Sequence, residues 1–200
     1  MSDNRESRHT QRMAHKKAVV DAAIARATES RGLVLVLTGN GKGKSSSAFG
    51  MVARALGHNM KVAVFQFIKG SGGTGEQAYF LRDPKVRWEE CGEGFTWDTQ
   101  DRTRDTAAAR SGWAKACQAL VDPSIGLVVL DEMTYLFKYG YLDLAEVLSV
   151  LAARPAMQHV VVTGRGAPQA LIDIADTVSE IADIKHAFRA GVKAQPGIDA

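Results

Sequence analysis

A run of apolar residues that ends in a turn rich in glycine and lysine constrains this chain more than any other feature of its sequence. Leu33–Leu37 has the composition of a buried strand, and Thr38-Gly-Asn-Gly-Lys-Gly-Lys-Ser45 follows it directly. From Ser45 onward, apolar residues recur at the spacing of an α-helix. Strand, loop and helix in this order are typical of a phosphate-binding loop, because backbone N–H groups and the helix N-terminus attract an anion.

The end of the loop suits a nucleotide. Lys44 is placed to reach terminal phosphates, and the Ser45 hydroxyl is placed to ligate Mg²⁺. The usual pattern G-x-x-x-x-G-K-[ST] is matched incompletely, since Thr38 stands where its first glycine belongs. A glycine-rich turn that binds nothing is the alternative, and the order of strand, loop and helix disfavours it. The residues expected to contact nucleotide are Thr38, Gly39, Asn40, Gly41, Lys42, Gly43, Lys44, Ser45 and Ser46.

A second apolar strand ends in two carboxylates. Leu127–Leu130 is followed by Asp131 and Glu132. An acidic residue at the end of a strand beside a phosphate loop is where Mg²⁺ finds a direct or water-mediated anionic partner. Alone this pattern is weak, because many strands end in Asp. Together with Lys44 and Ser45 it predicts a site for a nucleotide and Mg²⁺.

The composition describes a globular protein of ordinary hydrophobicity. Hydrophobic residues make up 46% and charged residues 24% of the 200 residues. The net charge of +3 lies largely near the N-terminus and beside the glycines, which favours phosphate affinity over a nucleic-acid platform. No apolar run approaches the roughly 18 residues of a membrane span, and no signal peptide is evident, so we expect a cytoplasmic protein. Cys91 and Cys117 are expected to be reduced thiols.

Periodicity predicts two parts of the chain. Residues 1–30 should comprise a polar N-terminus, without order over 2–10, and an amphipathic helix over 11–30 that either packs on its own domain or caps a site. Residues 31–200 should form a single α/β domain with a mostly parallel sheet and helices on both faces. The expected strands are 33–37, 61–68, 86–90, 127–131, 159–163 and 177–181, and the expected helices are 45–56, 102–120, 142–153 and 168–175. The glycine-rich loop 69–75 follows a strand, so it is a candidate wall of the site.

These patterns alone leave several functions open. A regulatory GTPase is disfavoured, because the guanine-reading sequence Asn-Lys-x-Asp is missing. A small-molecule kinase stays possible, since Asp101-Arg-Thr-Arg-Asp105 resembles an arginine-bearing lid. A binding module switched by ATP stays possible too, and turnover of ATP with a candidate acceptor would separate it from a kinase.

Six motifs in order resemble the ATP:corrinoid adenosyltransferases that carry a phosphate loop. The likeness extends from about residue 31 to 199, with a weaker match in the N-terminal helix. The motifs are Thr38-Gly-Asn-Gly-Lys-Gly-Lys-Ser45, Gln66-Phe-Ile-Lys-Gly70, Gly94-Phe-Thr-Trp-Asp-Thr-Gln100, Val129-Leu-Asp-Glu-Met-Thr-Tyr135, Thr163-Gly-Arg-Gly166 and His186-Ala-Phe-Arg-Ala-Gly-Val-Lys-Ala-Gln-Pro-Gly-Ile-Asp199. Ser45 and Ser46 stand where threonines are common, and the loop from Ser71 to Gly75 departs from the family.

The resemblance implies a P-loop NTPase-like (RecA-like) fold and transfer of the 5′-deoxyadenosyl group of ATP to the cobalt of a reduced corrinoid, with triphosphate released. It implies ATP held in a reversed sense, which Thr38 would fit. Lys42 and Lys44 would stabilise the leaving triphosphate, Arg165 would contact the nucleotide, and Ser45 and Glu132 would ligate Mg²⁺ with Asp131 close by. A homodimer and a transient reductase, a flavoprotein or another, are the implied partners, with no nucleic acid and no membrane.

Two aromatic residues carry a further expectation. By pattern alone Phe95 and Trp97 are core residues at strand spacing, but they lie among glycines and polar residues. The resemblance implies that they line the lower face of the corrinoid and favour a four-coordinate cobalt. No histidine lies in an Asp-x-His-x-x-Gly pattern, so a histidine ligand to cobalt is not expected. His186 is left as either a structural or a site residue.

Overall fold

The computed structural model describes residues 2–68, 73–92 and 101–198 of the chain. The chain divides into two compact units, Met1–Arg31 and Gly32–Ala200. The first unit contains the helix α1 (Ser2–Arg26), and the second contains the sheet and all remaining described elements.

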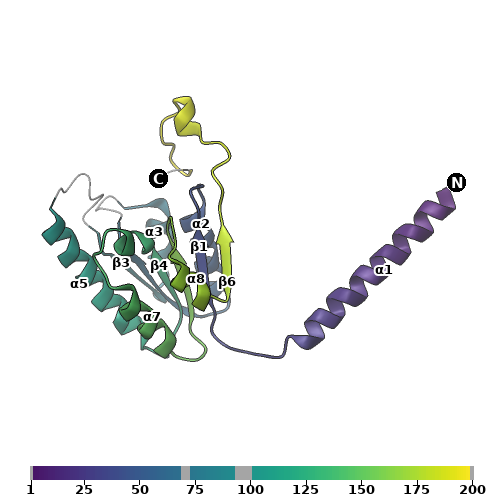
Figure 1. The fold of residues 1–200 in the computed structure, drawn as a ribbon, viewed down its shortest axis with the longest axis horizontal. Helices are drawn as coiled ribbons and strands as arrows, with labels where there is room; N and C mark the ends of the chain where they lie inside the picture. Colours follow the sequence, from purple (N-terminus) through teal and green to yellow (C-terminus); the bar gives the residue numbers. More distant parts are fainter. Residues whose placement is uncertain (1, 69–72, 93–100, 199–200) are drawn as a thin grey trace. The chain divides into compact units, whose positions relative to one another are not determined.

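The larger unit is built on six parallel strands (Figure 1). The strands are β1 (Val34–Thr38), β2 (Lys61–Gln66), β3 (Val86–Glu90), β4 (Ile125–Asp131), β5 (His159–Thr163) and β6 (Thr177–Glu180). They lie in the order β3-β2-β4-β5-β1-β6, and every pairing is parallel. All carboxyl ends therefore meet at one edge of the sheet, which is where open α/β sheets bind ligands. The predicted parallel sheet is confirmed.

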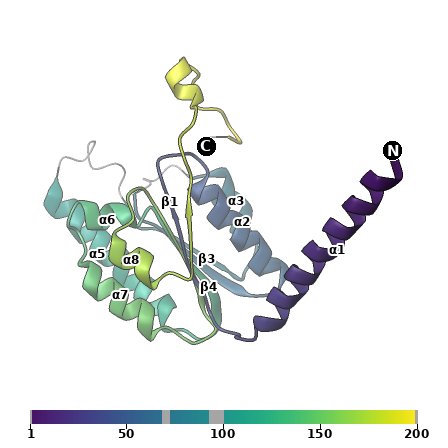
Figure 2. The same ribbon diagram turned by 45° about the vertical axis from the view of Figure 1, so that its right-hand side comes forward.

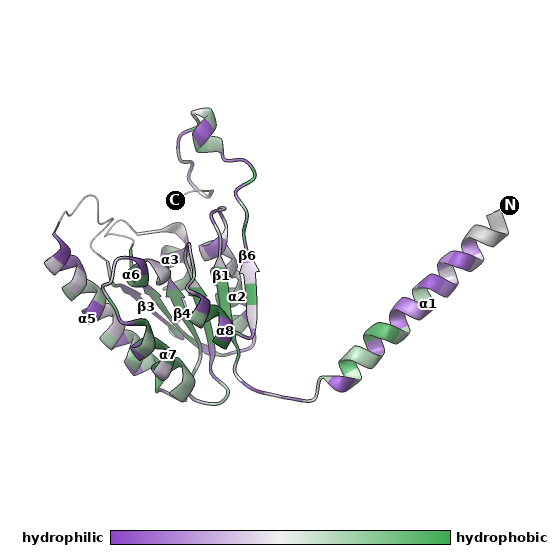
Figure 3. Cartoon of the chain, in the orientation of Figure 1, coloured by the Kyte–Doolittle hydropathy of each residue, from purple (hydrophilic) through white to green (hydrophobic). Residues whose placement is uncertain are grey.

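Helices cover both faces of this sheet (Figure 2). They are α2 (Lys44–Gly57), α3 (Gly75–Phe80), α5 (Arg102–Leu120), α6 (Thr134–Lys138), α7 (Leu144–Ala153) and α8 (Gln169–Ile174), and a 3₁₀ turn η1 (Ala187–Ala190) lies in the C-terminal tail. Alternation along β4 divides the core: Leu127 and Val129 pack with α2 and α3, whereas Val128 and Leu130 pack with the helices of the opposite face. β1 and β4 accordingly appear as hydrophobic segments in Figure 3.

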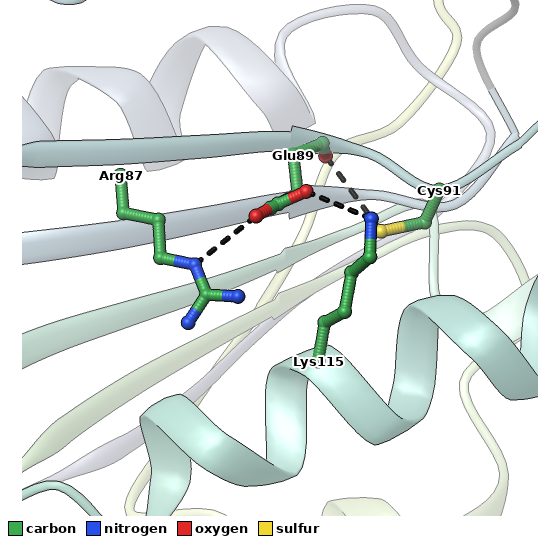
Figure 4. A network of polar contacts seen from close by, with 4 residues as sticks. All are labelled: Arg87, Glu89, Cys91 and Lys115. Carbon is green, nitrogen blue, oxygen red and sulfur yellow. Dashed lines mark hydrogen bonds and ion pairs between the residues drawn. The ribbon is translucent and has the colours of Figure 1, made fainter.

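The edge strand β3 is tied to α5 by charged side chains (Figure 4). Glu89 on β3 accepts hydrogen bonds from Arg87 Nε at 3.2 Å and from Lys115 Nζ at 3.0 Å, and Lys115 lies on α5. The Cys91 thiol beside them donates to the Glu89 carbonyl oxygen. Burial raises the pKa of Cys91 to about 12. The predicted reduced thiol is thus a buried group held in its neutral form.

Several element boundaries differ from the predictions. α1 begins at Ser2, where a lack of order was expected, and ends at Arg26. Residues within it support each other at helical spacing: the Thr10 hydroxyl donates to the Glu6 carbonyl at 3.0 Å, and Lys17 pairs with Asp21 at 2.5 Å. The short helices α3 and α6 were not predicted, because segments of 6 and 5 residues contain too few turns for a helical period to be recognised. None of the helices in the described part of the chain combines the length and apolar character of a membrane span.

Candidate functional site

The glycine-rich loop joins β1 to α2 as predicted. Gly39 and Gly43 have φ angles of 93° and 117°, in the region that favours glycine. Lys44 is the first residue of α2, and its side chain turns back so that Nζ donates to the Gly41 carbonyl at 2.7 Å. Only 6% of Lys44 is exposed. Burial lowers the pKa of Lys44, and nearby Arg165 lowers it further, while the negative charges of Glu132 and Asp131 oppose both effects.

Two glycines of the loop are required by contact with the C-terminal tail. A Cβ on Gly39 would lie 2.5 Å from the Ile181 carbonyl oxygen, and one on Gly41 would lie 2.4 Å from that of Ala182. The Gly41 N–H donates to the Ile181 carbonyl at 2.7 Å, and the Ile181 N–H donates to the Thr38 carbonyl at 2.9 Å. Gly43 has no atom within 4 Å of such a Cβ, so its requirement is conformational. The tail, which follows β6, thus packs directly against the backbone of the glycine-rich loop and supports its conformation.

Thr38 connects the loop to the segment after β5. Its hydroxyl oxygen accepts a hydrogen bond from the Ala167 N–H at 3.2 Å, and 8% of the residue is exposed. A glycine here would lose this contact. The residue that departs from the common pattern therefore links the glycine-rich loop to the loop that carries Arg165.

Asp131 is the centre of a buried hydrogen-bond network. One carboxylate oxygen accepts from the Thr163 hydroxyl at 2.7 Å, and the other accepts from the Gln66 amide at 3.0 Å. The Gln66 carbonyl oxygen in turn accepts from the Trp88 indole N–H at 3.0 Å. Because Asp131 is 0% exposed, these bonds offset the cost of burying its charge. The network links β2, β4 and β5 at their carboxyl ends and reaches β3 at its middle residue, Trp88.

Glu132 occupies an unusual backbone conformation at the end of β4. Its φ angle is 59°, and its N–H donates to the Thr163 hydroxyl oxygen at 2.9 Å. A non-glycine residue in the left-handed region costs free energy, and such strain concentrates at functional sites. The same threonine therefore holds both acidic residues, and it places Glu132 on the wall of the site.

A cavity of about 810 Å³ lies over the carboxyl edge of the sheet. Predicted residues on its wall are Gly41, Lys42, Gly43, Lys44, Ser45, Ser46, Glu132 and Arg165. Thr74 and Gly75 also line it, as expected for the loop after β2, although residues 69–72 lie outside the described ranges. Thr38 and Asp131 lie in the supporting layer described above. Three cationic side chains and the Glu132 carboxylate thus line one cavity together with backbone N–H and hydroxyl donors.

Part of the wall was not predicted. Glu76, Tyr79 and Phe80 of α3 line the cavity, as do Phe49, Gly50 and Ala53 of α2 and Tyr135 of α6. His186, Gly197 and Ile198 of the tail complete it. The family-like motif from His186 onward was the available signal for the tail. For α3 no signal existed, because neither its helix nor its place above the sheet is evident from six residues.

Comparison with known proteins decides the family. The family model "ATP:corrinoid adenosyltransferase BtuR/CobO/CobP" matches residues 30–200. The chain belongs to this family. A second model, "Cob(I)alamin adenosyltransferase N terminal", matches residues 1–24, which contain most of α1. The resemblance predicted from the motifs is confirmed.

Curated relatives of this adenosyltransferase family match nearly the whole chain. The corrinoid adenosyltransferase of Pseudomonas aeruginosa is 60% identical, over 99% of this chain and 98% of that protein. The corrinoid adenosyltransferase CobA of Salmonella typhimurium is 50% identical, over 97% and 98%. That of Escherichia coli strain K12 is also 50% identical, over the full length of both chains.

The donor set of the adenosyltransferase cavity fits Mg²⁺. Ser45 and Glu132 contribute oxygen atoms, which this ion prefers. Across the described ranges, no group of three or more His, Cys, Asp or Glu side chains is arranged to hold a metal by itself. Mg²⁺ typically takes only one or two protein carboxylates together with phosphate oxygens, so the arrangement suits an ion that arrives with a nucleotide.

The two aromatic residues predicted at the corrinoid lie outside the described ranges. Phe95 and Trp97 fall within residues 93–100, between β3 and α5. Their expected role stays a prediction.

Proposed function

We propose how this member of the ATP:corrinoid adenosyltransferase family carries out its reaction. Co(I) of the reduced corrinoid attacks C5′ of ATP with its electron pair, a Co–C bond forms, and the C5′–O bond breaks. Cobalt is formally oxidised to Co(III), and triphosphate leaves with the electrons of the broken bond. No general base is needed, because the nucleophile carries no proton.

The main support is the meeting of Lys44, Arg165 and Glu132 in one cavity at the phosphate loop. Triphosphate is a highly charged leaving group, so the transition state needs positive charge and N–H donors around it. Lys42, Lys44, Arg165 and the backbone of the loop supply these from a preorganised wall. Loss of one such donor typically lowers the rate by about 10²- to 10³-fold.

Ser45 and Glu132 would hold Mg²⁺, which would neutralise part of the phosphate charge. Asp131, whose two oxygens are already hydrogen-bonded, would hold Glu132 in position through Thr163. Asp131 would then act one layer behind the ion.

The segment 101–105, which suggested the arginine-bearing lid of a kinase, has a structural role in this fold. Asp101 caps α5 by accepting from the N–H groups of Thr103 and Arg104, and Arg102 donates to the Tyr139 carbonyl at 3.3 Å. These residues therefore stabilise α5 and its contact with α6. A lid role for this segment has no support in these contacts.

The deciding experiment is anaerobic incubation of the protein with MgATP and chemically reduced corrinoid. We expect adenosylated corrinoid, seen in its absorption spectrum, together with inorganic triphosphate in equal amount. ADP or AMP as the stoichiometric product would restore a phosphotransferase. Complete cobalamin and an incomplete corrinoid should be compared as acceptors in the same assay.

Phe95 and Trp97 would act when the acceptor starts as Co(II). Bulky rings without a donor atom would displace the lower ligand and exclude water, which makes reduction to Co(I) easier. Phe95→Ala and Trp97→Ala should cripple the reaction from Co(II) with a weak protein reductant, yet have much less effect when Co(I) is made beforehand. Equal losses in both assays with a lowered melting temperature would mean that the rings only stabilise the core.

A further inference from the structure

The C-terminal tail forms part of the nucleotide cavity. After β6 the chain continues beyond the carboxyl edge of the sheet and folds back, as the yellow segment of Figures 1 and 2 shows. Its first residue, Ile181, is hydrogen-bonded to Thr38 and Gly41 of the phosphate loop. His186 and Ile198 farther along line the cavity. The tail therefore begins at the loop, and its residues farther along form part of the cavity wall.

Hydrogen bonds within the tail hold His186 in place. The Arg189 guanidinium binds the Asp183 carboxylate through two bonds, of 2.5 and 2.9 Å, and so closes the segment on either side of His186. His186 itself caps the turn η1, because its Nδ1 accepts from the Phe188 N–H at 3.2 Å. Gly191, with a φ angle of 79°, ends the turn. The imidazole therefore has a defined orientation.

This bond also determines which ring nitrogen can donate. A nitrogen that accepts a hydrogen bond carries no proton, so neutral His186 is protonated on Nε2. The half-buried ring lies in the same cavity wall as Lys44 and Arg165. Its remaining polar group is thus an N–H donor beside a site for an anion.

We propose that His186 Nε2–H donates a hydrogen bond to an oxygen of the ATP triphosphate. The inference rests on the proposed function for the identity of the nucleotide, and it adds a substrate contact from the tail to those from the loop. It explains why His186, which is distant from the phosphate loop in the sequence, is held in position both by its own capping bond and by the Asp183–Arg189 pair.

Two substitutions distinguish the proposed hydrogen bond from Nε2–H to the triphosphate from the capping role of Nδ1. In His186→Asn the side-chain oxygen can replace Nδ1 as acceptor for the Phe188 N–H, but the donor is lost. In His186→Gln the amide reaches about as far as Nε2 and keeps a donor, while the cap is weakened. Val192→Ala is the control, since Val192 is an exposed tail residue away from the cavity wall.

The measurement is the dissociation constant of the full-length protein for MgATP and for inorganic triphosphate with Mg²⁺, by calorimetry. His186→Asn should weaken both by about tenfold, the worth of a hydrogen bond to a charged group, with an unchanged melting temperature. His186→Gln should retain most of the affinity, and Val192→Ala all of it.

Wild-type affinity of His186→Asn for both ligands would overturn the proposal. Weaker ATP binding with unchanged triphosphate binding would do so too, because the contact would then lie on the nucleoside. Equal losses of affinity in the Asn and Gln variants, together with lowered melting temperatures, would also overturn it, because His186 would then act only as the cap of η1. The proposed function fails separately: wild-type protein that binds triphosphate but forms no adenosylated corrinoid would refute the reaction and not the contact.

Discussion

Lys44 and Glu132 show how single residues in this cavity are prepared for an anion and a cation. Lys44 is buried, and its Nζ donates a hydrogen bond to the Gly41 carbonyl of its own loop. The negative charge of Glu132 favours the protonated form of Lys44. Glu132 is placed by a backbone conformation that most residues avoid. Both arrangements cost stability and place charge where a triphosphate and its ion would lie.

Lys44→Ala and Glu132→Ala should each lower turnover by at least about 10²-fold, because each removes a charge that the transition state would use. Steady-state assay at saturating MgATP measures the effect, and circular dichroism should show an intact fold. Near-wild-type turnover by either variant would contradict the proposed site.

Thr163 links the two carboxylates of β4. Thr163→Val keeps the shape of the side chain but removes the donor to Asp131 and the acceptor for the Glu132 N–H. We expect a loss of about 1–3 kcal/mol in the free energy of unfolding, because buried polar groups lose their partners. Activity should fall as well, since Glu132 is no longer held. Urea denaturation and kcat measure the two effects, and Thr163→Ser should restore most of both.

At the scale of elements, the phosphate loop depends on β6 and the tail as much as on its own glycines. Gly41→Ala should impair folding and nucleotide binding together, since the new Cβ would lie 2.4 Å from backbone of the tail. Gly57→Ala is the matched control: Gly57 ends α2, and no atom lies within 4 Å of a Cβ there. The control should raise the free energy of unfolding by up to about 1 kcal/mol, because alanine has a higher helix propensity than glycine. Thermal melting and MgATP titration compare the two, and a harmless Gly41→Ala would refute the supporting role of the tail.

The edge strand β3 gives a chemical prediction. Because only the thiolate reacts with alkylating reagents, the raised pKa and burial of Cys91 should keep it unmodified by iodoacetamide in the native protein at pH 8. Cys117, whose pKa burial also raises but which is less buried, should react first. Peptide mass spectrometry before and after denaturation measures both, and rapid native labelling of Cys91 would show that the β3–α5 contact opens readily.

At the scale of the whole molecule, α1 forms a unit by itself. Val19, Val20 and Ile24 lie at helical spacing, and a single helix has no second element of its own unit to cover them. Of the two roles expected for this helix, we propose that it caps a corrinoid site, its own or that of a partner subunit in a homodimer.

Deletion of residues 1–25 should then leave the melting temperature nearly unchanged and weaken corrinoid binding, since the core lies in Gly32–Ala200. Differential scanning calorimetry and a spectroscopic corrinoid titration test this. An insoluble product, or one that melts many degrees earlier, would assign α1 a packing role.

The sequence by itself determined the parallel α/β sheet, the phosphate loop and the acidic pair after β4. Their signals are contiguous: a strand's apolar run, the glycines after it and the helix period that follows lie within a few turns of chain. The family motifs are also short contiguous segments, and their resemblance to the adenosyltransferases indicated the reaction.

Only the tertiary structure decided how these parts support one another. The tail that requires Gly39 and Gly41 to be glycines, the Thr163 hydroxyl between two acids and the α3 wall all join residues far apart in the chain. Such contacts depend on which strands become neighbours and on where each side chain points. A local pattern of residue types contains neither, and for that reason the place of His186 on the cavity wall follows only from the fold of the tail.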